Sequence, residues 1–204
     1  GESNNEKTLN YFTHTIFYGI IISIFITYIG LNYADDIFNI MVTSPEVQSL
    51  GLEYTDVIFS GSVIFILVVC LNSLLHAEGD TKTYRNLLIL SFFLNILLNP
   101  IFIFGFLFIP AMGVKGIGVA TIISQFISLI IIFVKILNNN RVKQLSVNYF
   151  KPKFIYFKNL FFQSMPITIS ISASSFAFTV ILVYVGISGE YAVAGYGAGE
   201  RFIH

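Results

Sequence analysis

Two asparagines inside the uncharged stretch 86–114 are the first residues whose type and spacing could do chemistry. Asn95 and Asn99 lie four residues apart, which places them on one face of a helix. Pro100 follows and has no N–H to donate to the Ile96 carbonyl, so the helix should bend there. Two amide oxygens and a freed carbonyl could bind a hard cation or relay a proton. The alternative is that both amides only hydrogen-bond to neighbouring helices.

A second polar pair occurs in the next uncharged stretch, 116–134. Thr121 and Gln125 are four residues apart, and small residues recur beside them with the same period at Gly116, Ala120, Ser124 and Ser128. Because only 110–115 separates the two stretches, we expect an antiparallel helical hairpin with both polar pairs at similar depth. The small residues predict close helix packing. For Thr121 and Gln125, packing and the lining of a cavity are both open interpretations.

Hydroxyl side chains recur with a helical period in a third uncharged stretch, 159–189. Their spacing of four, four, three and four puts them on one helix face: Ser164, Thr168, Ser172, Ser175 and Thr179. Such a face on an otherwise apolar helix suits a water-filled cavity. Hydrogen bonding between helices explains the same pattern equally well.

The elements that must position these residues follow from the composition. Of the 204 residues, 55% are hydrophobic and 11% are charged, against about 25% charged in soluble domains. Five stretches carry no charge: 8–34, 57–77, 86–114, 116–134 and 159–189. Each is close to or above the roughly 20 helical residues that cross a bilayer. We therefore predict an all-α, polytopic transmembrane bundle with five spans and the beginning of a sixth near Tyr191.

Several classes of protein are excluded by what the chain lacks. Eleven basic and eleven acidic residues give no excess charge for binding nucleic acid. The single Cys70 rules out an intramolecular disulfide and a cysteine-based zinc site. The histidines, His14, His76 and His204, are scattered, and no hydrolase, metalloprotease or nucleotide-binding motif occurs. We expect neither an enzyme nor a structural metal.

The basic residues predict the orientation in the membrane. Nine of them precede the first span or lie in the loops 78–85 and 135–158, whereas the opposite side has Lys115 alone. The segment 34–56 has no basic residue and five acidic ones. Because positively charged loops stay in the cytoplasm, we place 78–85 and 135–158 there and the loop 34–56 outside.

Five stretches, in this order and spacing, resemble one family of membrane exporters. They are 43–54 with Thr43-Ser44-Pro45-Glu46-Val47 and Glu53-Tyr54, 76–83, 95–105, 113–125 and 192–201. The resemblance is to the multidrug and toxic compound extrusion (MATE) family, and it runs across nearly the whole chain. It is specific for the family but not for a substrate.

The resemblance implies a twelve-helix protein of two six-helix lobes, of which this chain is a fragment. Residues 1–136 would be N-lobe, with helices over about 11–33, 57–76, 86–108 and 114–136. The basic segment 137–158 would be the cytoplasmic interlobe linker. Residues 159–204 would start the C-lobe, with a helix over about 160–187 and the next from about 191. The missing helices of the same chain would complete both lobes.

The family also implies a function and a site. We expect an antiporter that exports amphipathic, cationic drug-like compounds against Na⁺ or H⁺ by alternating access, with no other cofactor. Its cation or proton site would use Asn95, Asn99 and Thr121, but Asn99 stands where the family has an acidic residue. An amide cannot exchange a proton, although its oxygen can bind Na⁺. Gln125 and the hydroxyls of 164–179 would line the cavity, within the lipid bilayer of a bacterial inner membrane.

One alternative within the same superfamily is a flippase for lipid-linked saccharides or a polysaccharide exporter. Such a protein should have basic residues along its cavity to hold a pyrophosphate. The five uncharged stretches contain none. The drug exporter is therefore the favoured interpretation.

Overall fold

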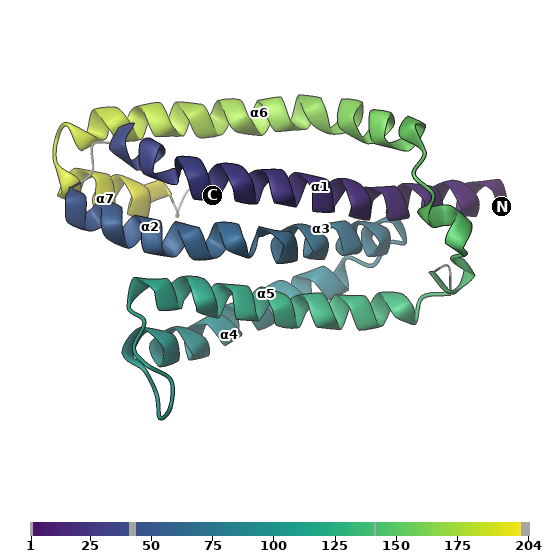
Figure 1. Ribbon diagram of the computed structural model, residues 1–204, viewed down its shortest axis with the longest axis horizontal. Helices are drawn as coiled ribbons and strands as arrows, with labels where there is room; N and C mark the ends of the chain where they lie inside the picture. The colour runs from purple at the N-terminus through teal and green to yellow at the C-terminus, as the bar shows by residue number, and fades with distance from the viewer. Residues whose placement is uncertain (1, 41–43, 141, 201–204) are drawn as a thin grey trace.

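The computed structural model describes residues 2–40, 44–140 and 142–200 as a bundle of long helices that run nearly side by side (Figure 1). The α-helices of the described residues are α1 (Glu2–Ile40), α2 (Pro45–Ser60), α3 (Ser62–Ala77), α4 (Lys82–Phe104), α5 (Val114–Leu137), α6 (Phe154–Gly186) and α7 (Glu190–Glu200). Two short 3-10 helices, η1 (Val142–Gln144) and η2 (Val147–Phe150), lie between α5 and α6.

The helices are long and apolar enough to confirm the predicted transmembrane bundle. Residues Glu6–Ile40 of α1, together with α4, α5 and α6, each qualify as a span by length and composition. The pair α2–α3 qualifies as a fifth span when its two helices, bent by 47°, are taken together. A bilayer provides no partner for backbone polar groups, so helices that satisfy them internally are the expected architecture.

The bend between α2 and α3 lies at Gly61. The Gly61 N–H donates to the carbonyls of Val57 at 3.1 Å and Ile58 at 3.2 Å, and the regular hydrogen-bond ladder breaks there. A Cβ on Gly61 would lie 2.5 Å from Cδ1 of Ile122 in α5. The absence of a side chain at Gly61 therefore lets α5 approach the bend closely.

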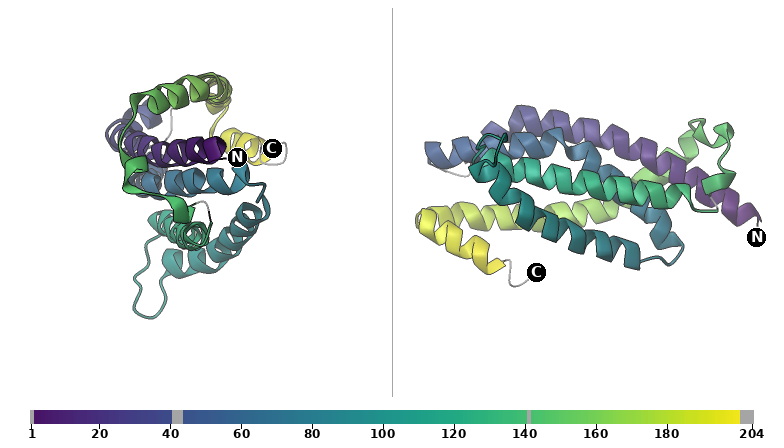
Figure 2. Two further views of the ribbon diagram at one scale, coloured as in Figure 1. Left: turned by 90° about the vertical axis from the view of Figure 1, so that its right-hand side faces the viewer. Right: turned by 90° about the horizontal axis from the view of Figure 1, so that it is seen from below.

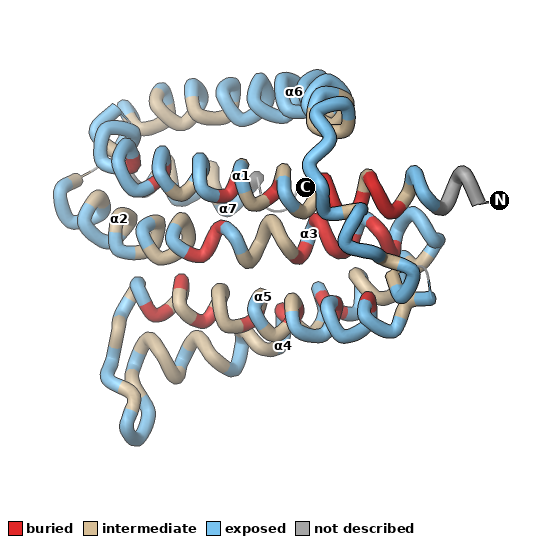
Figure 3. The backbone as a smooth tube through the Cα atoms, turned by 45° about the vertical axis from the view of Figure 1, so that its right-hand side comes forward, coloured by how far each residue is buried: buried red, intermediate tan, exposed pale blue. Residues whose placement is uncertain are grey.

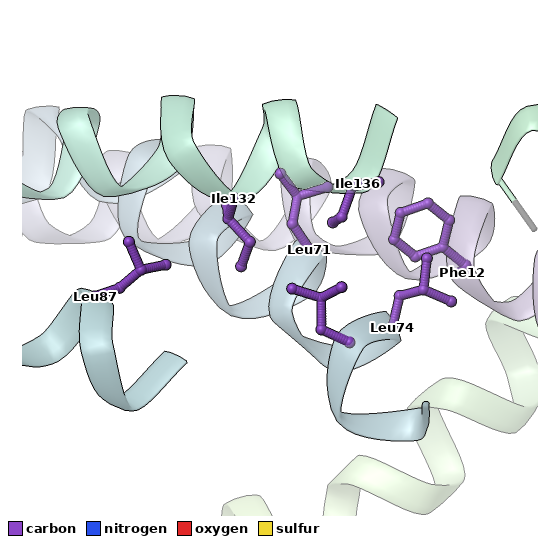
Figure 4. Packing of buried hydrophobic residues seen from close by; sticks show 7 residues of the cluster. Phe12, Leu71, Leu74, Leu87, Ile132 and Ile136 are labelled. Atoms are coloured by element: carbon purple, nitrogen blue, oxygen red, sulfur yellow. The ribbon is translucent and has the colours of Figure 1, made fainter. Parts of the chain in front are cut away.

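The helices are arranged in layers, with α1, α3 and α5 at the centre. Both Figure 1 and the end-on view of Figure 2 show α6 on one side of α1, with α3 and then the α4–α5 hairpin on the other. The apolar core consists of Phe12, Leu71, Leu74, Leu75, Leu87, Ile132 and Ile136 (Figure 4). Figure 3 shows the buried residues concentrated on α1, α3 and α5, whereas no residue of α6 is buried.

The prediction that 34–56 forms a loop is wrong, because most of that segment is helical. α1 continues to Ile40, beyond the predicted end near residue 33, and α2 already begins at Pro45. The Ser44 hydroxyl caps α2 by accepting from the Val47 N–H at 3.4 Å. Charged residues do not by themselves end a helix. The acidic residues of this segment lie on helical turns, Asp35 and Asp36 on α1 and Glu46, Glu53 and Asp56 on α2.

Other helix ends differ from the predicted ones for local reasons. α4 ends at Phe104, not near 108, because Gly105 has φ +79° and a tight turn closes with the Phe106–Ile109 bridge. α6 begins at Phe154, six residues before the predicted start. The segment between α5 and α6 contains η1 and η2, where the sequence suggested only a linker.

Candidate functional site

The structure brings Asn95 of α4 and Thr121 of α5 into contact. The Thr121 hydroxyl lies 3.1 Å from Oδ1 of Asn95 and 2.9 Å from the Ile117 carbonyl, and it can donate to either acceptor. The Asn95 amide N–H₂ donates in turn to the Ser91 carbonyl at 2.9 Å. Two residues that are 26 positions apart thus meet because the short connection after α4 makes α4 and α5 antiparallel.

Asn99 provides an unpaired acceptor on the same face of α4. Its Oδ1 is buried and has no hydrogen-bond partner among the described residues. A buried acceptor without a donor costs about 1–3 kcal/mol. This oxygen, one helical turn from Asn95, is therefore well suited to a cation or to a donor supplied by a ligand. α4 continues through Pro100 for one more turn to Phe104.

Close packing of α5 sets the separation of the two helices. Gly116, Ala120, Ser124 and Ser128 are all buried, as the four-residue period predicts, and the same face continues through Ile132 and Ile136. A Cβ on Gly116 would lie 2.6 Å from the backbone carbonyl carbon and oxygen of Phe102. The hydroxyls of Ser128 and Ser91 are 2.9 Å apart across the interface. The predicted packing role of these residues is confirmed.

Gln125 and the hydroxyls of α6 are not joined to this contact. Gln125 is half-buried on α5, one turn after Thr121. Thr168 donates to the Ser164 carbonyl at 2.9 Å and Thr179 to the Ser175 carbonyl at 2.9 Å, so both bond within their own helix. Of the five predicted residues, Thr168, Ser172 and Ser175 are exposed and Ser164 and Thr179 are half-buried. Their helix, α6, lies on the opposite side of α1 from α4 (Figure 2).

The candidate site is built from neutral oxygen atoms. From Thr81 to Gly189 the sequence has no acidic residue, so neither α4 nor α5 supplies a carboxylate. Within the part of the chain that the structure describes, no group of three or more His, Cys, Asp or Glu residues could hold a metal ion. Amide and hydroxyl oxygens suit a hard monovalent cation better than a transition metal.

Sequence reasoning missed a polar cluster at the bend of the α2–α3 pair. The Thr27 hydroxyl lies 2.7 Å from Ser62 Oγ and donates to the Phe59 carbonyl at 2.9 Å. The Ser62 hydroxyl donates to the Ser23 carbonyl at 3.1 Å. Ser23 and Thr27 are four residues apart within an uncharged stretch, which is the signal that could have identified them.

Comparison with known proteins places this helical arrangement in a family. The sequence model of the MatE family matches residues 1–101. A solved structure described as the inward-facing conformation of a multidrug resistance MATE family transporter of the MOP superfamily superposes with a TM-score of 0.86. It is 26% identical, and the match covers 98% of this chain and 45% of that one. The chain belongs to the MATE family.

Two curated MATE relatives match different extents of the chain. The probable multidrug resistance protein NorM of Thermotoga maritima is 34% identical over 128 residues, which is 62% of this chain and 27% of NorM. The multidrug export protein MepA of Staphylococcus aureus (strain NCTC 8325) is 24% identical across 100% of this chain and 44% of MepA. The chain therefore spans less than half the length of these MATE relatives.

A second structural neighbour shows the breadth of the superfamily. A transporter of the MOP superfamily from Pyrococcus furiosus, described as having a binding pocket of reverse polarity that suggests a different function, superposes with a TM-score of 0.79. It is 27% identical, over 96% of this chain and 43% of its own. MATE proteins are multi-pass membrane transporters, and the apolar helices of this chain agree with that class.

Proposed function

We propose that this chain forms part of a MATE transporter that exports amphipathic organic cations in exchange for Na⁺ or H⁺ by alternating access. The observation that carries the proposal is the Asn95–Thr121 contact beside the unpaired Asn99 oxygen. Relatives named as multidrug resistance and export proteins support the choice of substrate class. Lobes that rock around a central site would alternate its access between the two faces of the membrane.

The chemistry of the site favours Na⁺ as the ion bound by these residues. Asn95, Asn99 and Thr121 offer oxygens that can coordinate a hard cation, whereas none of the three side chains gains or loses a proton near neutral pH. Bound Na⁺ would satisfy the Asn99 oxygen and would favour the conformation in which the site is assembled. A carboxylate elsewhere in the full-length protein would complete the charge balance.

The uncharged walls of the spans favour cationic over anionic substrates. The chain has 22 Phe and 11 Tyr residues, and the uncharged stretches contain no Lys or Arg that could hold a phosphate or pyrophosphate. Aromatic faces attract organic cations and bury their apolar surface. This composition supports a drug exporter over a flippase for lipid-linked saccharides.

We further propose the orientation that the basic residues predict, in a bacterial inner membrane. The segment 78–85, whose Lys82 and Arg85 lie in the first turn of α4, and the segment 135–158 would face the cytoplasm, and the acidic segment 34–56 would face outward. The α5–α6 connection then lies where a cytoplasmic linker between lobes is required.

Efflux by the full-length protein in proteoliposomes tests both the coupling and the site. We expect a Na⁺ gradient to drive export of a cationic dye, and Asn95→Ala to lower the initial rate about tenfold, as the loss of roughly 1.4 kcal/mol of ion binding would. Thr55→Val, which removes a hydroxyl that bonds within α2 and is not among the candidate site residues, is the matched control. Efflux that ignores both Na⁺ and pH gradients would contradict the coupling. Na⁺-driven efflux that is unchanged in Asn95→Ala would contradict the site.

A further inference from the structure

A buried polar cluster on the first third of α1 has no role in the proposed transport site. Asn10 and Thr13 are each 1% exposed and His14 is 0% exposed, although all three side chains are polar. Buried polar groups are normally retained with hydrogen-bond partners, since burial without partners is costly. Each of the three side chains bonds to a carbonyl of α1, and each also contacts the segment that connects α5 to α6, more than 130 residues away in the sequence.

The contacts hold the connecting segment by its backbone. The Thr13 hydroxyl is 2.9 Å from the Tyr149 carbonyl and can donate to it or to the Leu9 and Asn10 carbonyls of its own helix at 3.1 and 3.0 Å. The Lys153 backbone N–H donates to Nε2 of His14 at 2.9 Å. Nδ1 of His14 lies 2.7 Å from the Asn10 carbonyl. Because Nε2 accepts, the hydrogen of the neutral ring must be on Nδ1, where it is donated to Asn10.

Aromatic rings close the remaining sides of the His14 ring. The centroid of Tyr156 lies 4.8 Å from that of His14, and the centroid of Phe157 lies 5.3 Å away. Tyr11 packs edge-on against Tyr156 at 4.8 Å and its hydroxyl accepts from the Asn159 amide at 3.0 Å. The segment 149–159, which includes the first turns of α6, is thus fixed against α1 around one histidine.

We propose that His14 is a pH-sensitive positioning residue: the neutral ring holds the segment 149–159 against α1, and protonation of the ring releases it. The proposal concerns the position of the linker and does not depend on transport activity. A protonated ring carries hydrogen on both nitrogens. Nε2 could then no longer accept from Lys153, and two N–H groups would face each other in a fully buried site.

One ammonium group lies next to the cluster that contains His14. The Lys153 ammonium lies 3.4 Å from the Asn10 side-chain oxygen and 5.9 Å from the Tyr156 centroid, so it is adjacent to the cluster. Among the described residues, no carboxylate contacts His14. The ionisable groups on the elements packed around it are Glu6, Lys7, Tyr11 and Tyr18 on α1, Cys70 and His76 on α3, Tyr149, Lys151 and Lys153 on the connecting segment, and Tyr156 and Lys158 on α6.

Acidification therefore favours the released linker. A histidine is the side chain whose charge most readily changes between pH 5 and 8. Release removes the Lys153 and Tyr149 contacts together, because both depend on the same short segment. The start of α6 is then free to move relative to α1.

Hydrogen–deuterium exchange of the full-length protein in lipid nanodiscs tests this directly. Peptides that cover 149–157 are followed at pH 8.0, 7.0 and 5.5, with rates corrected for intrinsic exchange. We expect about tenfold faster corrected exchange at pH 5.5 than at pH 8.0 in the wild type, as the loss of a buried hydrogen bond would produce. His14→Gln, whose neutral amide oxygen can accept from Lys153, should abolish the pH response. His14→Lys should exchange rapidly at every pH.

Two control variants separate the proposed switch from general destabilisation. His76→Gln replaces an exposed histidine on α3 and should leave the wild-type pH response intact. Thr13→Val removes the Tyr149 contact but not the titrating group, so exchange should rise at every pH while the response to pH persists. Equal corrected exchange at pH 8.0 and 5.5 in the wild type would overturn the proposal. So would a pH response that persists in His14→Gln or in His14→Lys.

Discussion

Two helices, α5 and α6, carry small polar residues at nearly the same spacing, but these residues differ in burial and in their hydrogen-bond partners. On α5, Ser124 and Ser128 are buried against α4 and Ser128 bonds to Ser91 of that helix. On α6, Ser164 is half-buried and Thr168 is exposed, and both bond to carbonyls of their own helix. Figure 3 shows the same contrast, with buried residues along α5 and none along α6.

The difference shows that helical periodicity defines a face but not what covers that face. α5 has Gly116 and Ala120 on its face, so a neighbouring backbone can approach it closely. Bulkier residues separate the hydroxyls of α6. Among the described residues, no neighbouring backbone approaches α6 as closely as α4 approaches α5. A hydroxyl bonded within its own helix is satisfied without any neighbour and is compatible with either a cavity or a lobe interface.

The largest expected effect comes from filling the closest approach on α5. Gly116→Leu places a side chain where a Cβ alone would lie 2.6 Å from the Phe102 carbonyl group, so α4 and α5 must separate. We expect the free energy of unfolding of the full-length protein to fall by about 3 kcal/mol. Ala173→Leu on the exposed face of α6 should change it by less than about 0.5 kcal/mol. Equal losses of unfolding free energy in both variants would contradict the difference in packing between α5 and α6.

A smaller effect is expected from the interhelical hydroxyl. Thr121→Val removes the donor to Asn95 Oδ1 while conserving shape, and it leaves that half-buried oxygen unpaired. The unfolding free energy should fall by about 1.5 kcal/mol, measured by denaturant titration in detergent. If Thr121→Val is as stable as the wild type, the Asn95–Thr121 contact does not hold α4 and α5 together.

The free energy of unfolding should depend on pH through the ion pair between Asp80 and Lys135. The Lys135 ammonium, 2.6 Å away, together with the Thr83 hydroxyl and N–H, lowers the pKa of Asp80 below its usual range. This stabilisation is present above the unfolded pKa of about 3.9 and is lost as pH falls through the lower folded value. Asp80→Asn should therefore cost up to about 1 kcal/mol at pH 7, since the pair is partly exposed, and progressively less toward pH 3. Asp36→Asn, in an exposed turn of α1, should cost nothing at either pH.

The smallest effect is expected on α6 itself. Thr168→Val removes a hydroxyl that bonds only to the Ser164 carbonyl, so stability should change by less than about 0.5 kcal/mol. Calorimetry of the full-length protein would measure it. A loss above about 1.5 kcal/mol would mean that another part of the full-length chain packs on this face, and α6 would then resemble α5.

Much of the fold follows from the sequence because the bilayer imposes one simple requirement. Uncharged stretches of about 20 residues are sufficient to place α4 and α5, and their ends are predicted to within a few residues. α1 and α2 are less well predicted, because both helices continue through charged turns at which the uncharged stretches end. The bend at Gly61 was also missed, since a Ser-Gly-Ser sequence in an apolar run is compatible with a straight helix.

The candidate site was predictable only where residues are close in sequence. The four-residue spacing placed Asn95 and Asn99 on one face, and the short 110–115 connection brought Thr121 near them. The contacts of Thr13 and His14 with Tyr149 and Lys153 were not predictable, because they join parts of the chain separated by about 140 residues. Whether the unpaired Asn99 oxygen binds an ion remains a prediction.

The length of α1 has a mechanical consequence. Its 39 residues give a rod of about 58 Å, roughly twice the thickness of the hydrocarbon core. Near the middle of α1, Gly19 packs closely against Cys70 and Thr27 hydrogen-bonds to Ser62, so α3 holds α1 in place at that depth. If α1 tilts about this point, its two ends move in opposite directions. A displacement of the end that carries His14 would therefore move the other end in the opposite direction, together with α2, whose Gln48 side chain donates to Asp35 at 2.7 Å.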